Sequence, residues 1–141
     1  MNFTESLMVG RDFEELGRAA DQMRTWLADV LDDDRAAKVE LAFVEALSNS
    51  IRHAPSDRVK PIGIFLDVSD AEVAIEIADD SPPMPTLFHG AGEQKLDLAT
   101  LDRENLAEGG RGLSLIVLSM DQVSFVLSAG QVRLRMVLNR G

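Results

Sequence analysis

The sequence contains no cysteine, so neither a disulfide framework nor a thiolate metal site can form. No apolar run approaches the ~20 residues that a membrane-spanning helix requires, and the first residues lack the organisation of a signal peptide. Basic residues are scarce as well, since 14 Lys and Arg stand against 24 Asp and Glu, a net charge of −10. We therefore expect a cytoplasmic protein that binds neither membranes nor nucleic acid directly, because this charge repels anionic surfaces.

The 141 residues suffice for a single domain, and 45% hydrophobic with 27% charged content is typical of a globular protein. Alternating apolar residues predict strands, at 3–9, 62–68, 73–77, 123–128 and 132–138. Helical spacing of apolar residues predicts helices, at 13–30, about 35–53 and 112–120.

The last of these helices is apolar almost all round and is expected to be buried. The weakly patterned stretch from 81 to 110 has room for one more short helix, at about 94–107. Runs of helix beside strand hairpins predict an α+β fold, with the helices packed on one face of a mixed, mostly antiparallel sheet.

Three polar residues recur at intervals of four along the second predicted helix: Glu45, Asn49 and His53. A helix places them along one edge, because each four-residue step turns only about 40°. An amide oxygen is a suitable Mg²⁺ ligand, and a carboxylate one turn away can accept a proton during attack on a phosphate. A partly exposed polar edge, with His53 favouring the helix dipole, explains the same residues without any chemistry.

Two further motifs lie at a strand end and at a helix start. Asp79 and Asp80 follow a predicted strand, where a carboxylate can accept from an amine such as that of adenine, although Asp-Asp-Ser-Pro is also an ordinary turn. Gly109, Gly110 and Gly112 open the buried helix, and small residues there allow backbone amides to approach an anion. A purely structural turn explains these glycines equally well, and no P-loop sequence GxxxxGK[ST] occurs.

In this order the motifs resemble the GHKL (Bergerat-type) ATP-binding fold of gyrase, Hsp-type chaperones and histidine kinases. More narrowly, VEALSNSIRHA, DDSPPMP and EGGRGLSLIVLSMDQV look like the serine-kinase anti-sigma factors of the RsbW and SpoIIAB type. The resemblance covers roughly residues 10 to 140. It implies one histidine-kinase-like ATPase domain over residues 1–141, with an ATP lid at about 82–110.

The resemblance also implies two cofactors, ATP and Mg²⁺, and a role for each motif residue. Asn49 would coordinate Mg²⁺, Glu45 would act as general base towards a serine of a protein substrate, and His53 would add a supporting polar contact. Phosphate contacts are expected from the third motif, at Gly110, Arg111, Gly112 and Ser114.

On the base side of the pocket, Asp79 should receive the adenine amine, with Asp80 as a substitute. The family has glycines in this turn where the present sequence has Ser81 and Pro83. Because Ser81 precedes a proline it favours extended geometry, so the adenine-side turn must differ in detail. These two residues favour the alternative of a catalytically weak GHKL-fold module that regulates a partner protein without kinase activity.

Partners follow from the resemblance too. Such proteins form homodimers that sequester a sigma factor and phosphorylate a serine of a STAS-domain anti-sigma factor antagonist. Arg18, on the exposed side of the first predicted helix, is either a contact to one of these partners or a solvated side chain. A small kinase or ATPase outside sigma-factor control is a further alternative. A detached histidine-kinase domain is disfavoured, because His53 and His89 are the only histidines and no helical hairpin carries a phospho-acceptor.

Overall fold

The computed structural model describes residues 2–52, 61–79, 93–96, 110–128 and 131–140. The elements in these ranges follow one another in the order β1 (Phe3–Val9), α1 (Phe13–Leu27), α2 (Asp33–Arg52), β2 (Ile62–Val68), β3 (Glu72–Ala78), β4 (Glu93–Leu96), α4 (Gly110–Ser119), β5 (Gln122–Ser128) and β6 (Gln131–Asn139). Within the described ranges, no helix is both long and apolar enough to cross a membrane.

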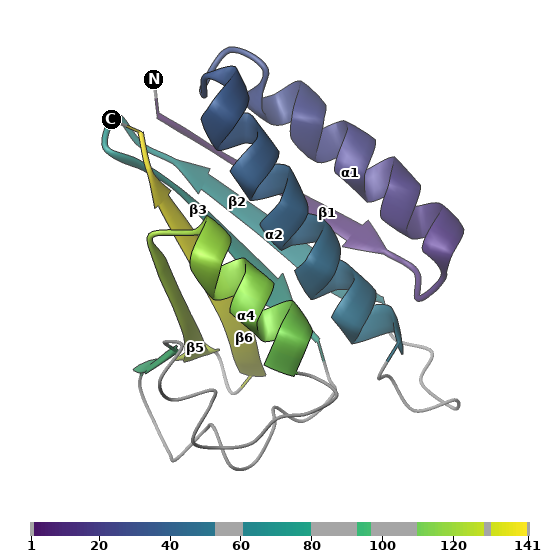
Figure 1. Cartoon of the computed structure of the whole chain (residues 1–141). Helices are drawn as coiled ribbons and strands as arrows, with labels where there is room; N and C mark the ends of the chain where they lie inside the picture. Colours follow the sequence, from purple (N-terminus) through teal and green to yellow (C-terminus); the bar gives the residue numbers. More distant parts are fainter. Residues whose placement is uncertain (1, 53–60, 80–92, 97–109, 129–130, 141) are drawn as a thin grey trace.

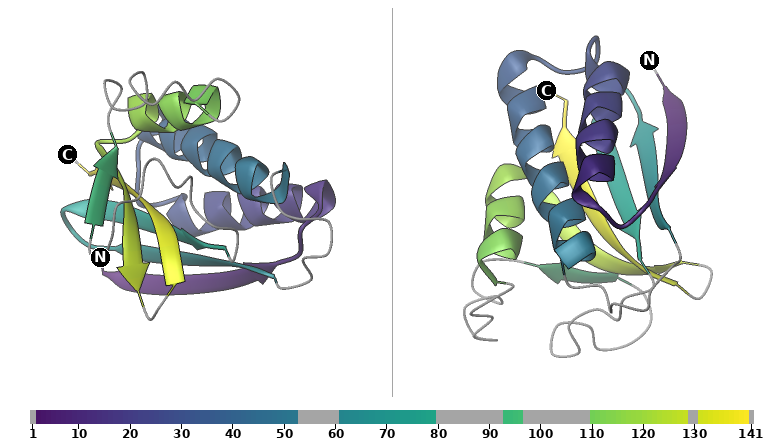
Figure 2. Two further views of the ribbon diagram at one scale, coloured as in Figure 1. Left: turned by 90° about the horizontal axis from the view of Figure 1, so that it is seen from below. Right: turned by 90° about the vertical axis from the view of Figure 1, so that its right-hand side faces the viewer.

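The strands form one six-stranded sheet in the order β1-β2-β3-β6-β5-β4, and each neighbouring pair is antiparallel. The helices α1, α2 and α4 lie on the same face of this sheet (Figures 1 and 2). The predicted α+β architecture is therefore confirmed. The sheet was expected to be mixed, but the described strands contain no parallel pair.

The core lies between the sheet and the helices. Alternate residues of β2 and β3, among them Ile64 and Ile75, point towards the helices and are fully buried, and α2 contributes Phe43 and Leu47 from the other side. Burying one such side chain stabilises the fold by about 1.5–3 kcal/mol. Because a shift of one residue would turn these side chains towards solvent, this burial also sets the register of the strands.

Acidic residues begin the first two helices. The Oδ1 atom of Asp12 accepts a hydrogen bond from the Glu15 amide at 2.9 Å, and Asp32 does the same for the Arg35 amide at 2.8 Å. Each bond satisfies an amide that lacks a partner inside the helix. α1 ends at Leu27, three residues earlier than its apolar stripe predicted. Val30, the last residue of that stripe, still packs against the core.

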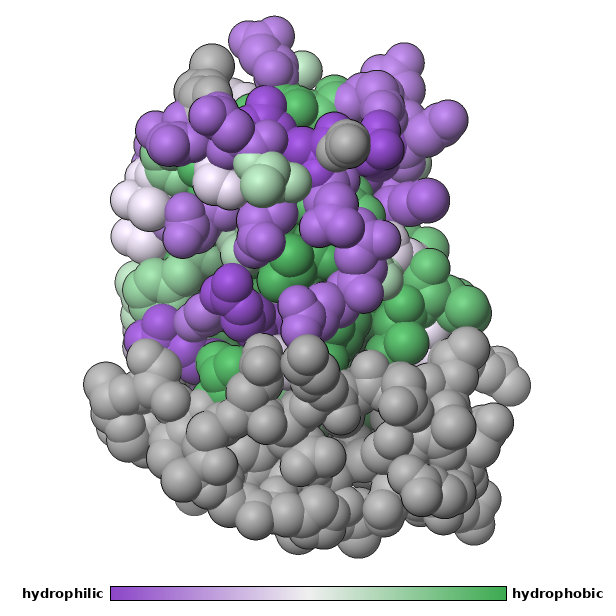
Figure 3. All heavy atoms as spheres, turned by 90° about the vertical axis from the view of Figure 1, so that its left-hand side faces the viewer, coloured by the Kyte–Doolittle hydropathy of each residue, from purple (hydrophilic) through white to green (hydrophobic). Residues whose placement is uncertain are grey.

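Two expectations about the second half of the chain are wrong. Residues 94–96 belong to strand β4, which pairs with β5, and not to a helix, because the sheet edge offers partners for their backbone groups. Helix α4 is also less buried than predicted, since Leu118 is 66% exposed although Ile116 is fully buried. α4 lies at the margin of the helix layer and packs with one face only, and hydrophobic residues appear on that side of the surface in Figure 3.

Candidate functional site

Three elements end at the same edge of the molecule. The C-terminal end of α2, the end of β3 and the start of α4 all lie at the lower edge in Figure 1. These are the elements that carry the three predicted motifs. The fold therefore brings together residues that are far apart in the sequence.

Two of the motifs meet where Asn49 approaches Gly112. Asn49 is half-buried on α2, and Gly112 lies in the first turn of α4. A Cβ atom placed on Gly112 would lie 2.8 Å from Nδ2 of Asn49 and 3.3 Å from its Oδ1. Only glycine allows this contact without displacing the amide, so the first and third motifs are packed directly against each other.

Glu45 precedes Asn49 by one turn of α2 and lies along the same edge of the helix. Its side chain is half-buried, and within the described residues no hydrogen bond or ion pair engages its carboxylate. A carboxylate in this setting can accept a proton from a group bound beside it. The predicted role of Glu45 is therefore chemically feasible, and it stays a prediction.

Asp79 directly follows β3 and is bonded to a residue that the sequence analysis missed. Nη2 of Arg11 donates to Oδ1 of Asp79 at 2.6 Å, and the two side chains are only 9% and 12% exposed. Arg11 lies between β1 and α1, 68 residues away in the sequence. No local pattern signals a pair so far apart, because only the assembly of β1, β2 and β3 into one sheet brings the two residues together.

A comparison with protein families assigns the chain to a known domain. The model of the histidine kinase-like ATPase domain matches residues 11–138, which include all three motifs and both members of the Arg11–Asp79 pair. The chain belongs to this family. It is therefore an ATP-binding module of the GHKL type, and the family indicates ATP-dependent kinase or ATPase chemistry. No curated protein matches the sequence.

A second arginine of this ATPase domain also lies at the site. Nη2 of Arg52 donates to Oγ of Ser48 at 2.8 Å, and Nη1 lies 3.4 Å from Oδ1 of Asn49. Ser48 is the main partner, because the second distance is long for a hydrogen bond. The signal was present in the sequence, since Arg52 follows Ser48 by four residues and Asn49 by three. It places a positive charge beside the amide predicted to bind the metal.

The start of α4 completes the edge. A helix beginning at Gly110 leaves its first backbone N–H groups without partners inside the helix, and these suit an anion. Ser114 is half-buried in the next turn. Several predicted site residues lie outside the described part of the chain, so their roles stay predictions. They are His53, Asp80, Ser81, Pro83, most of the predicted lid and the side chain of Arg111.

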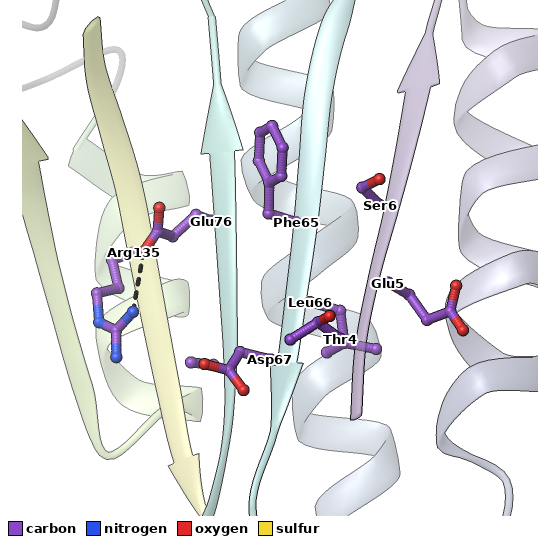
Figure 4. Close-up of a pocket in the computed structure, with 9 residues that line it drawn as sticks. Thr4, Glu5, Ser6, Phe65, Leu66, Asp67, Glu76 and Arg135 are labelled. Carbon is purple, nitrogen blue, oxygen red and sulfur yellow. Dashed lines mark hydrogen bonds and ion pairs between the residues drawn. The ribbon is translucent and has the colours of Figure 1, made fainter. Parts of the chain in front are cut away.

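The opposite face of the sheet has a hollow of its own, with a volume of about 480 Å³ (Figure 4). Its lining includes Phe65, Glu76 and Arg135 and none of the predicted site residues. Nη1 of Arg135 donates to Glu76 at 2.9 Å, and Arg133 donates to the same carboxylate while lying over the Phe65 ring. Glu5 and Asp67 line the hollow as well, so carboxylates outnumber arginines in its lining, which does not suit a phosphate.

Proposed function

We propose that this domain is a protein-serine kinase that uses Mg-ATP to phosphorylate a serine of a STAS-domain anti-sigma factor antagonist. In the same proposal it acts as a homodimeric anti-sigma factor and sequesters a sigma factor in partner switching. The observation that carries the catalytic part is the packing of Asn49 against Gly112, one helical turn from Glu45. A proton acceptor, a metal ligand and a phosphate-binding helix start then lie side by side.

Each of these groups has a distinct task in the proposed transfer. The amide oxygen of Asn49 would hold Mg²⁺, which takes one or two protein oxygens in nucleotide sites and offsets the charge of the phosphates when bound. The first N–H groups of α4 would orient the phosphate chain. Glu45 would take the proton of the substrate serine as its oxygen bonds to the γ-phosphorus, while the bond from phosphorus to the β-phosphate oxygen breaks and ADP leaves.

The assignment of partners rests on the three sequence segments that resemble serine-kinase anti-sigma factors. The net charge of −10 is compatible with a partly basic partner, since opposite charges speed association and orient the two surfaces. Arg18 is less available than a solvated arginine, because it donates to both carboxylate oxygens of Glu15 at 2.7 and 3.0 Å. A partner that used Arg18 would have to share it with Glu15.

Phosphate transfer to a STAS-domain protein tests the kinase directly. With radiolabelled ATP and Mg²⁺, the native protein should label one serine of its antagonist. Glu45→Gln should slow this labelling by about 10²–10⁴-fold and leave nucleotide binding intact, because only the proton acceptor is lost. Glu40→Gln is the matched control on the same helix, since Glu40 pairs with Arg24 on the surface. Equal rates in Glu45→Gln and in the native protein would refute the assignment of the base.

The alternative, a module that grips a partner without kinase activity, is favoured by Ser81 and Pro83, which stand where the family has glycines. Size-exclusion chromatography with a sigma factor separates the alternatives. Stoichiometric capture without phosphate transfer would indicate the binding module. Transfer or ATP hydrolysis without capture would indicate a kinase or ATPase outside sigma-factor control.

A further inference from the structure

We propose that Arg11 is a positioning residue that fixes the carboxylate of Asp79 and thereby makes the site select a 6-amino purine over a 6-keto purine. The inference rests on the proposed nucleotide site and deepens it, because it names the residue on which the base preference depends. It concerns the first residue that the family match covers, which lies outside all three sequence motifs.

The first support is the geometry of the pair. The distance of 2.6 Å between Nη2 of Arg11 and Oδ1 of Asp79 is that of a short charge-assisted hydrogen bond. With side chains only 9% and 12% exposed, both charges are largely removed from water. Such a pair holds its members in one orientation more firmly than a surface ion pair does.

The second support is the way in which the backbone around Arg11 is held. Before it, Val9 ends β1 fully buried, and the Gly10 amide donates to Oε1 of Glu15 at 3.1 Å. After it, Asp12 caps α1 through the Glu15 amide at 2.9 Å. Arg11 therefore extends from a segment that is anchored on both sides, as precise placement of a functional group requires.

The chemistry of the carboxylate gives the direction of the selectivity. An ionised carboxylate only accepts hydrogen bonds, and a neighbouring guanidinium favours this charged form. Its two oxygens offer about four acceptor positions, so one carboxylate can serve both an arginine and an amine. The 6-amino group of adenine donates to such an acceptor, whereas the 6-keto oxygen of hypoxanthine would face it with a second acceptor. If Asp79 is displaced or protonated, the site no longer distinguishes the 6-amino group from the 6-keto oxygen.

Calorimetric titration with ADP and with inosine diphosphate, both with Mg²⁺, tests the proposal on the whole chain. The two nucleotides differ at the 6-position of the base and its adjoining ring proton. The native protein should prefer ADP. In Arg11→Gln we expect ADP affinity to fall by roughly tenfold or more, with a smaller change for inosine diphosphate, so that the ratio of the two dissociation constants falls. Arg11→Lys should restore part of the ratio, since it keeps a positive donor.

Arg35→Gln is the matched control, because Arg35 forms a surface pair with Asp32 at the start of α2. It should leave both affinities and their ratio unchanged. Thermal unfolding of each variant reports whether the fold survives, and if Arg11→Gln does not fold, the ratio in Arg11→Lys against the native protein decides.

Three results would overturn the proposal, and they are distinguishable from one another. Equal weakening of both nucleotides in the Arg11 variants would mean that Arg11 is only structural, while the nucleotide site stands. Equal affinity of the native protein for the two nucleotides would refute the selectivity and again leave the site. Failure of the native protein to bind either nucleotide would remove the proposed function together with this inference.

Discussion

Two carboxylates only three residues apart, Glu76 and Asp79, belong to opposite sides of the molecule. Glu76 points to the outer face of the sheet and accepts from Arg133 at 3.2 Å and Arg135 at 2.9 Å, both on the adjacent strand β6. Asp79 continues the alternation of the buried residues of β3 towards the helices and accepts from Arg11 at 2.6 Å. Both acids are paired with arginines, but those of Glu76 lie on the adjacent strand and that of Asp79 lies 68 residues away, before α1.

The difference shows what each pairing does. The arginines of Glu76 are its cross-strand neighbours in the same sheet, and such pairs add about 0.2–1 kcal/mol each to the stability of a sheet. The arginine of Asp79 comes from the turn before α1 and meets it at the edge where α2 ends and α4 begins. We infer that the outer pairs stabilise the sheet, whereas the inner pair belongs to the nucleotide site.

If the two faces differ in this way, the largest effect on nucleotide affinity is expected from Gly112→Ala. A Cβ there would lie 2.8 Å from Nδ2 of Asn49, and the flexible amide would have to move away. Displacing Asn49, the proposed metal ligand, by about 1 Å should weaken Mg²⁺-dependent ADP binding by roughly 10–100-fold, while stability changes by less than about 1 kcal/mol. Calorimetry and thermal unfolding measure the two quantities.

The matched control is Gly17→Ala on α1, where nothing lies within 4 Å of the added Cβ. This variant should gain about 0.5–1 kcal/mol of stability, as alanine does in a helix interior, and should keep its nucleotide affinity. Unchanged affinity in Gly112→Ala would contradict the role of the Asn49 contact.

A smaller effect is expected from Glu76→Gln, which should lower stability and not nucleotide affinity. The change removes the carboxylate that Arg133 and Arg135 share, although Arg135 keeps Glu72 at 3.7 Å. We expect a loss of about 1 kcal/mol in the free energy of unfolding, because these side chains are partly screened by solvent. ADP affinity should not change. Glu5→Gln on β1 is the control, since Glu5 is exposed and has no ion pair within the described part of the chain. A fall in ADP affinity in Glu76→Gln would break the distinction between the two faces.

The smallest effect is expected on the pH dependence of stability, through Glu15, which holds the Gly10 amide next to Arg11. Hydrogen bonds from Arg18 and from the Gly10 amide lower the pKa of Glu15 from 4.5 to about 2. Since the folded state has the lower pKa, the stabilisation by Glu15 is complete above pH 4.5 and is lost as the pH falls towards about 2. The difference in urea-unfolding free energy between the native protein and Glu15→Gln should shrink over this interval. A difference that is independent of pH would contradict the prediction.

Most of the fold could be predicted from the sequence. The alternation in 3–9, 62–68 and 73–77 and the helical spacing of apolar residues predicted elements that agree with the structure to within a few residues. The two exceptions, β4 and the exposure of α4, depend on where these elements lie in the fold. The few residues of β4 carry no clear period and pair only because β5 presents a free edge. The exposure of Leu118 depends on the position of α4 at the margin of its layer, which an apolar helix does not reveal.

The candidate site divides in the same way. The sequence by itself determined that Glu45 and Asn49 share one edge of a helix and that Asp79 ends a strand, because these relations span only a few residues of regular backbone. Only the tertiary structure decided that Gly112 packs against Asn49 and that Arg11 is bonded to Asp79. Local periodicity orients a side chain on its own element, but which two side chains meet depends on how whole elements pack.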